Sequence, residues 1–78
     1  MFDVRVVHVP PGCDRPYDAA EWEDAIVFVQ RGEIELRGVS GAARSFGRGD
    51  LIWLEGVPLR VLRNRGREPA VLVAVSRP

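Results

Sequence analysis

The chain has 78 residues, with eleven arginines, no lysine, eleven acidic side chains and a formal net charge of zero. This length is enough for one domain, residues 1–78, and the balanced charge gives no long-range attraction to nucleic acid or an anionic membrane. So short a chain buries only about 60–65% of the surface that its unfolded form exposes. The single cysteine, Cys13, excludes an internal disulfide. We therefore expect a homodimer to supplement the small core.

The N-terminal residues contain no basic stretch followed by an apolar run, so the sequence predicts no signal peptide. Every apolar run is far shorter than the ~20 residues that a membrane-spanning helix needs. We expect a cytoplasmic protein without a membrane segment.

The beginning of the chain has the alternation of a strand. Phe2, Val4 and Val6 alternate with Asp3 and Arg5, which is the pattern of a half-buried strand. Two prolines and a glycine then end it, because proline has no donor for a β-ladder. A polar segment follows, which reads as a loop or an irregular edge strand with one short helical turn.

The clearest strand is residues 25–30, an apolar run with β-branched and aromatic side chains. Gly32 follows it, and residues 33–37 then alternate so that Ile34 and Leu36 face inward. We interpret Gly32 as the turn residue of a hairpin between these two strands, because glycine tolerates a positive φ.

Four more strands are predicted along the rest of the chain, each separated from the next by glycine, proline or asparagine. They cover residues 42–46, 51–54, 59–63 and 70–75. Strands that recur roughly every eight to twelve residues, without an amphipathic helix, indicate an all-β sandwich or barrel.

Two segments of the chain are framed by turn residues at regular spacing. Gly12 and Gly32 bracket the first, and Gly49 and Asn64 bracket the second. This framing resembles the cupin family, whose members are small barrels on a jelly-roll plan. The resemblance implies an all-β, cupin-like jelly-roll β-barrel over the whole chain.

The resemblance also assigns positions to the family's metal ligands. In the first motif the two histidine positions fall on Asp18 and Ala20, and the glutamate position falls on Ala25. In the second motif the histidine position falls on Arg60. Alanine offers no lone pair, arginine is a permanent cation without an acceptor, and one carboxylate is a poor site for a divalent ion. We therefore expect no metal and no other cofactor.

Arg60 is the leading candidate for a binding residue. If it keeps the inward direction of the histidine, it brings a charge into an apolar interior and needs a partner. Asp18 is the first candidate, and the alternatives are Glu21, Glu23 and Asp24. The pair either fills the vacated cavity, or Arg60 receives a small carboxylate or phosphate through its planar fork. A third reading has Arg60 extending to the barrel mouth.

Three aromatic residues, Trp22, Trp53 and Tyr17, are candidates for the wall of a pocket, with packing in the core or in a dimer interface as the alternative for Trp53. We accordingly expect a non-catalytic module, without catalytic residues, that binds a small polar or anionic molecule through Arg60, Asp18, Trp53 and Tyr17. One alternative is a metal-independent isomerase-like or epimerase-like cupin enzyme, for which His8 is the available base. The other is a structural or dimerisation domain with a closed barrel.

Overall fold

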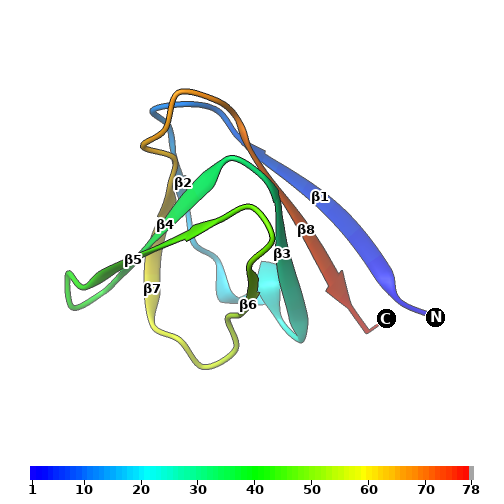
Figure 1. Cartoon of the computed structure of the whole chain (residues 1–78). Coiled ribbons are helices and arrows are strands. Elements are labelled where there is room, and N and C mark those ends of the chain that lie inside the picture. The colour runs from blue at the N-terminus through cyan, green and yellow to red at the C-terminus, as the bar shows by residue number, and fades with distance from the viewer. Residues whose placement is uncertain (78) are drawn as a thin grey trace.

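The computed structural model describes residues 1–77 and consists of strands, turns and one short 3-10 helix (Figure 1). The elements in chain order are β1 (Asp3–Val9), β2 (Asp14–Pro16), η1 (Ala19–Trp22), β3 (Ala25–Arg31), β4 (Glu33–Gly38), β5 (Ala43–Gly47), β6 (Leu51–Trp53), β7 (Leu59–Arg63) and β8 (Ala70–Ser76). The prediction of an all-β fold is confirmed. No helix within residues 1–77 combines the length and the apolar composition that a bilayer crossing requires.

The strands form two four-stranded sheets in which the paired strands are antiparallel. The first sheet has the order β1-β8-β3-β6 and the second has the order β2-β7-β4-β5. In Figure 1 the sheets converge beside the β7–β8 loop and diverge toward η1. This is the two-layer plan of a jelly roll, but no ladder joins the sheets in the described chain, so the expected closed barrel is only partly confirmed. Edge strands β2 and β6 are three residues long and offer little backbone for such a closing ladder.

The core lies between the sheets and follows from strand alternation. In β3, Ala25, Val27 and Val29 are buried, whereas Ile26 and Phe28 between them are exposed. In the second sheet, Ile34 and Leu36 of β4 are buried and face the core, as their alternation predicts. Trp22 of η1 is 1% exposed and fills the core with its ring.

In strand β1 the buried side differs from the one that the sequence suggested. Val4 and Val6 are 64% and 51% exposed, whereas Val7 and Val9 are buried. The register explains this choice, because Val7 and Val9 lie opposite the buried residues of β8. The alternation correctly predicted a strand, but it places the first valines on the outer side of the sheet.

Gly32 is a turn residue, but the expected hairpin is wrong. β3 pairs with β6 and β8, whereas β4 pairs with β5 and β7, so the turn carries the chain from one sheet to the other. Gly32 has a φ of 74°, and a Cβ there would lie 2.5 Å from the carbonyl oxygen of Pro69. This close approach of the β7–β8 loop, together with the positive φ, restricts the position to glycine.

Asn64 fastens the convergent end of the two sheets. Its side chain is fully buried, and its amide nitrogen donates to the carbonyl oxygens of Val9 at 2.9 Å and Glu68 at 2.8 Å. Its side-chain oxygen accepts from the N–H of Gly66 at 2.9 Å. Every polar atom of this amide therefore has a partner, which makes its burial favourable.

Candidate functional site

An apolar hollow opens between the two sheets, and we call it the inter-sheet pocket. Its volume is about 530 Å³. It is lined by Leu36, Gly38, Ser40, Ala42, Ala43, Arg44, Phe46, Ile52, Trp53, Leu54, Val57, Pro58 and Leu59. These residues come from β4, β5, β6, β7 and the turns beside them. Most are apolar, so the pocket offers a hydrophobic wall to an occupant.

Strand β5 brings one cation to this wall. Arg44 lies opposite Leu36, and Phe46 lies opposite Ile34. Directly opposed residues of an antiparallel pair share a face, so Arg44 and Phe46 point to the same side as the buried residues of β4; on this edge strand Phe46 is half-buried and Arg44 is exposed. The guanidinium carbon of Arg44 is 5.5 Å from the centre of the Phe46 ring. This cation–π contact orients the guanidinium against the pocket wall.

The electrostatics of the inter-sheet pocket are one-sided. Arg44 is the one charged side chain among the lining residues, and Ser40 contributes a hydroxyl group. Within residues 1–77, no carboxylate lies within ion-pair distance of Arg44. A guanidinium without an internal counter-ion, next to an apolar wall, suits a ligand that carries an anionic group on an apolar body.

Arg60 does not keep the inward direction on which the ion-pair and receptor hypotheses depend. Arg60 is exposed, and in the part of the chain that the structure describes it makes no ion pair. The cause is an irregularity in the ladder: Arg37 pairs with Val61 and Gly38 pairs with Leu59, which leaves Arg60 without a partner on β4. Leu59 packs against the core in this region, and the side chain of the extra residue, Arg60, points away from the core.

None of the four predicted partners reaches Arg60. Asp18 caps η1 by accepting from the N–H of Ala20 at 3.1 Å. Glu21 instead pairs with Arg15 at 2.7 Å and with Arg5 at 3.8 Å. Glu23 and Asp24 are exposed and form no ion pair with it within residues 1–77. The buried ion pair was inferred from motif spacing, and the bulge in β7 removes its premise.

The aromatic candidates separate into two places. Trp53 is 53% exposed and borders the inter-sheet pocket. Tyr17 lines a smaller pocket of about 290 Å³ with Trp22, Glu23 and Glu55. Partial burial and the charge of Asp18 raise the pKa of Tyr17 above its ordinary value. The backbone N–H of Tyr17 donates to the carbonyl oxygen of Arg60 at 2.9 Å, so the chain brings these segments together without joining their side chains.

The positions assigned to metal ligands do not make a metal site. Asp18 is engaged as a cap, Ala20 and Ala25 present methyl groups, and Arg60 is exposed. Within residues 1–77, no cluster of three or more histidine, cysteine, aspartate or glutamate side chains is arranged to hold an ion. These residues do not fit the donor set that a divalent metal requires.

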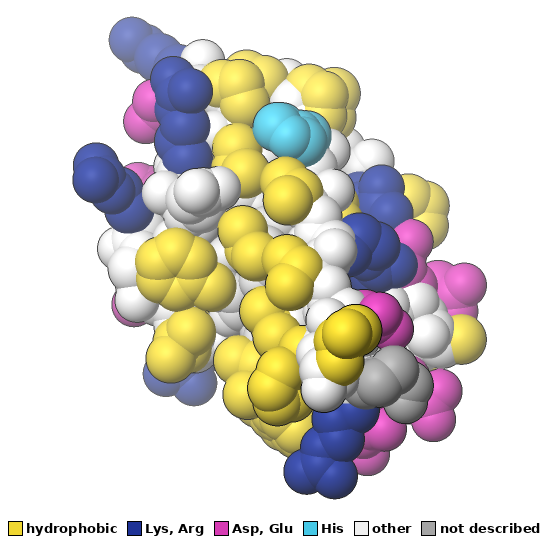
Figure 2. Space-filling model, turned by 90° about the vertical axis from the view of Figure 1, so that its right-hand side faces the viewer, with side chains coloured by type: hydrophobic (Ala, Val, Ile, Leu, Met, Phe, Trp, Pro, Cys, Tyr) yellow, Lys and Arg dark blue, Asp and Glu magenta, His cyan; other side chains and the backbone are white. Residues whose placement is uncertain are grey.

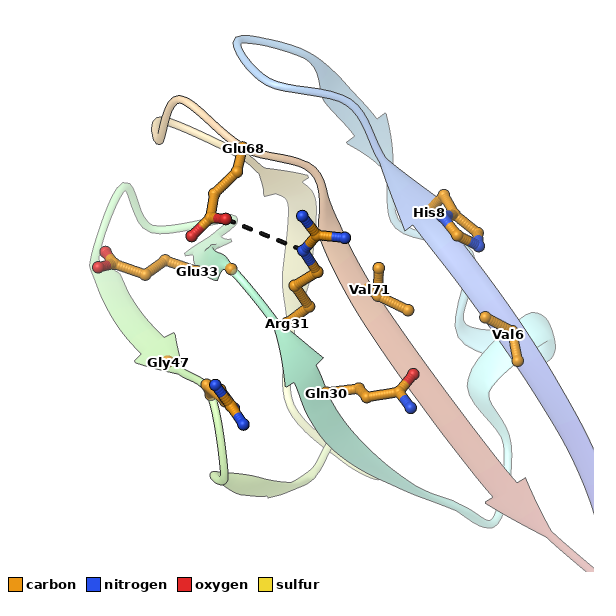
Figure 3. A pocket seen from close by; sticks show the side chains of 10 residues that line it. Val6, His8, Gln30, Arg31, Glu33, Gly47, Glu68 and Val71 are labelled. Carbon is orange, nitrogen blue, oxygen red and sulfur yellow. Dashed lines mark ion pairs between the residues drawn. The ribbon is translucent and has the colours of Figure 1, made fainter.

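His8 lies outside the interior. It is exposed on the outer side of β1, in the same alternation as Val4 and Val6. There it borders a groove of about 790 Å³ together with Gln30, Arg31 and Glu68 (Figure 3). A role for His8 as a base inside the barrel, which the enzyme alternative needs, is therefore wrong.

Sequence reasoning missed Arg44, although the necessary signals were present. The glycine-bounded turn at residues 38–41 predicts a hairpin between the strands on either side of it. The register of such a hairpin sets Arg44 opposite Leu36, which was already assigned to the core side. Motif spacing directed attention to Arg60 instead.

The fold and the glycine frame have counterparts among known proteins. A model of the cupin domain matches residues 5–76. The chain belongs to the cupin family. A search of proteins with curated functions found no match.

Solved structures share the architecture of this cupin chain. A Cupin 2 conserved barrel domain protein from Salinispora arenicola is similar with a TM-score of 0.79 and 26% identity, over 99% of this chain. The match covers 63% of that protein, so the present chain spans less than two thirds of its length. The cupin domain of an XRE family transcriptional regulator from Enterobacter cloacae has a TM-score of 0.69 and 22% identity, over 99% of this chain and 81% of that one. The second similarity concerns the fold alone.

Proposed function

We propose that this cupin domain is a non-catalytic binding module for a small organic anion, held in the inter-sheet pocket by Arg44. The observation that carries this proposal is the position of Arg44, which lies on the core side of β5, stacks on Phe46 and has no carboxylate partner within residues 1–77. An occupant places its carboxylate or phosphate on the guanidinium fork and its apolar part against the aliphatic wall.

The size and lining of the inter-sheet pocket support a small ligand. Its volume of about 530 Å³ falls within the range of about 300–1,000 Å³ typical of ligand pockets. Trp53 borders the pocket and offers it an aromatic edge. The ligand contacts predicted for Asp18, Tyr17 and Arg60 stay predictions, since these side chains do not line this pocket.

The side chains of the inter-sheet pocket favour binding over proton-transfer chemistry. No histidine, cysteine, aspartate, glutamate or tyrosine lines it, so the wall provides no group suited to act as a general base. Arg44 stays protonated at ordinary pH and holds charge without exchanging protons. This arrangement supports the non-catalytic module over the isomerase-like alternative.

The test is a thermal-shift and calorimetric titration with simple carboxylates from benzoate to octanoate, with benzamide as the neutral counterpart of benzoate. We expect the anions to raise the melting temperature of the wild type and benzamide to leave it unchanged. Arg44→Ala weakens anion binding by about 10–100-fold, because a charge-assisted hydrogen bond is worth about 1.5–3 kcal/mol.

Arg60→Ala is the matched control, since it removes an exposed arginine outside the pocket and is expected to bind as the wild type does. Equal binding by wild type and Arg44→Ala, or a response in Arg60→Ala alone, rejects the pocket proposed here. If no carboxylate of the series binds the wild type, the alternative of a structural domain is favoured.

A further inference from the structure

The two sheets meet along two sides of the molecule, and on each side an edge strand of one sheet faces an edge strand of the other. Strands β1 and β2 are edge strands joined by a turn, and so are β5 and β6. We call the gaps between them the β1–β2 seam and the β5–β6 seam. The interior is accessible at a seam unless another part of the chain covers it.

The β1–β2 seam is covered by η1. Arg5 of β1 and Arg15 of β2 both lie opposite buried residues of the neighbouring strand, so they point to the core side. Both pair with the carboxylate of Glu21, at 3.8 Å and 2.7 Å. The guanidinium carbon of Arg5 also lies 5.1 Å from the centre of the Trp22 ring. A segment that carries a carboxylate thus bridges the two edge strands.

The β5–β6 seam has a similar arginine but no such segment. Arg44 lies 5.5 Å from the centre of the Phe46 ring, close to the distance between Arg5 and Trp22. The inter-sheet pocket lies in this seam, because residues of both β5 and β6 line it. Among the described residues, no carboxylate pairs with Arg44. The seam therefore lacks the element that η1 supplies on the other side, a length of chain with a carboxylate.

The backbone of β5 offers hydrogen bonds to an added strand. β5 is the last strand of its sheet in the described chain, so one of its edges has no neighbouring strand. The N–H of Gly38 donates to the carbonyl oxygen of Ala42 at 2.7 Å, which makes these residues a hydrogen-bonded pair where β4 and β5 meet. Such pairs alternate with non-hydrogen-bonded pairs along a ladder, so the backbone groups of Ala43 and Ser45 point to the free edge. These are the groups that pair with an added strand.

We propose that the β5–β6 seam binds an extended peptide, which adds to the free edge of β5 and places a carboxylate side chain opposite Arg44. This inference rests on the proposed function, since it names the class of organic anion that Arg44 holds. In an antiparallel arrangement, the peptide residue two positions before the acidic one lies opposite Phe46. Directly opposed residues share a face, so both side chains project toward the inter-sheet pocket. The acidic residue pairs with the guanidinium, and an apolar residue at the earlier position contacts the pocket wall.

The peptide site is distinct from the outer side of the first sheet, where Figure 2 shows a field of apolar side chains. A peptide on β5 extends the second sheet at its edge. Its contacts lie along that edge and in the pocket between the sheets. Binding therefore depends on the backbone of β5 and on Arg44, and it leaves the outer side of the first sheet uncovered.

The first test is calorimetric titration of the wild type with the pentapeptide Thr-Leu-Thr-Glu-Thr. The peptide is acetylated and amidated, so that the glutamate carries its one charge. Leucine and glutamate are two positions apart and lie on the same side of an extended strand. We expect saturable binding, which weakens by at least about 10-fold when glutamine replaces the glutamate. The control peptide Thr-Thr-Leu-Glu-Thr has the same composition but places the two side chains on opposite sides, and it is expected to bind comparably weakly.

A variant of the edge separates peptide binding from the binding of simple carboxylates. Ser45 lies opposite Glu35, and its side chain is not part of the pocket lining. Ser45→Pro removes the N–H at the free edge, and proline is tolerated in an edge strand where that N–H faces solvent. We expect the variant to bind the peptide about 10-fold more weakly and to bind octanoate as the wild type does. Ser45→Ala keeps the N–H and is the matched control, with wild-type binding of both.

A modified peptide tests the same hydrogen bonds without changing the protein. Methylation of the backbone nitrogen of the central threonine, which lies opposite Ser45, should weaken binding to the wild type by about 10-fold. The peptide proposal is overturned if the parent peptide does not bind, if the methylated peptide binds equally well, or if folded Ser45→Pro binds the peptide as the wild type does. In each case the proposed function stands as long as octanoate binds the wild type more tightly than Arg44→Ala. Equal binding of octanoate by those two proteins rejects the proposed function instead.

Discussion

The outer faces of the two sheets are built from opposite kinds of side chain. On the second sheet, Arg63 donates to both carboxylate oxygens of Asp14 at 2.7 and 2.9 Å. Beside them Glu35 accepts from Arg37 at 3.0 Å and from Arg65 at 3.4 Å. On the first sheet, the corresponding outer positions carry valines and large apolar residues. One face is satisfied by water and by its own ion pairs, whereas the other is not.

The outer side chains of the two sheets are stabilised in different ways. Burial raises the pKa of Glu35, but the hydrogen bonds and charges of Arg37 and Arg65 outweigh it, so that the pKa lies below its ordinary value. The carboxylate is thus already stabilised within one chain. The apolar outer side of the first sheet gains nothing comparable from residues 1–77, because apolar surface is stabilised by removal from water and these side chains are exposed. The charged side is therefore stabilised within one chain, whereas the apolar side presents its side chains to water.

The largest effect is expected where the two sheets are fastened together. Asn64→Asp replaces a donor to Val9 and Glu68 by a charged acceptor facing their carbonyl oxygens. We expect a loss of about 3–5 kcal/mol in the free energy of unfolding, because two buried hydrogen bonds are lost and a charge is buried. Urea denaturation at neutral pH measures this loss. The variant tests whether the two sheets, with their different outer faces, are held together at this residue.

Acid provides the internal control for Asn64→Asp. The introduced carboxyl group is disfavoured as an anion in the folded state, so its folded pKa is raised and its penalty shrinks as pH falls toward the unfolded value. The stability difference from wild type should therefore be smaller at low pH. A difference that is constant with pH would attribute the effect to packing alone.

A smaller effect is expected at the turn that carries the chain from the apolar-faced sheet to the charged-faced sheet. Gly32→Ala requires a positive φ from alanine and brings its Cβ against the carbonyl of Pro69. The left-handed backbone conformation costs alanine about 1–2 kcal/mol, and the clash with Pro69 adds to this cost. Gly12→Ala is the control, since Gly12 has a similar φ of 73° but no atom within 4 Å of the added Cβ. Equal losses of melting temperature in the two variants would contradict the role given to Pro69.

The smallest effect is expected on the charged face. The hydrogen bonds from Arg63 hold the pKa of Asp14 below its ordinary value. A depressed folded pKa means that the pair stabilises the fold above the unfolded pKa and that this contribution is lost as pH falls through the folded pKa. Asp14→Asn should therefore lower the melting temperature slightly at neutral pH and by less in acid. An exposed pair contributes little, so a large loss would show that the charged face is more important than the comparison suggests.

Local patterns predicted most of the strands correctly. The helical turn near Trp22, the inward direction of Ile34 and Leu36, and the bounds of β7 agree with the structure. These features depend on alternation and on turn residues, which act over a few positions of the chain. The cupin frame was recognised from the spacing of glycines for the same reason.

The candidate site was predicted poorly because it depends on pairing between distant strands. Counting along a motif suggested an inward direction for Arg60, but one unpaired residue in β7 changes the direction of its side chain. Arg44 reaches the inter-sheet pocket because β5 pairs with β4 in a particular register. A slip of one residue in that ladder moves every side chain of β5 to the opposite face.

The sequence by itself determined that this chain forms short strands joined by tight turns, and that it belongs with the cupins. Only the tertiary structure decided which apolar residues are buried, because Val4 and Val7 have the same kind of side chain and differ in what lies opposite them. Alternation establishes that a strand has two faces. Which face is covered is decided by the packing of the second sheet, a long-range contact that no local pattern records.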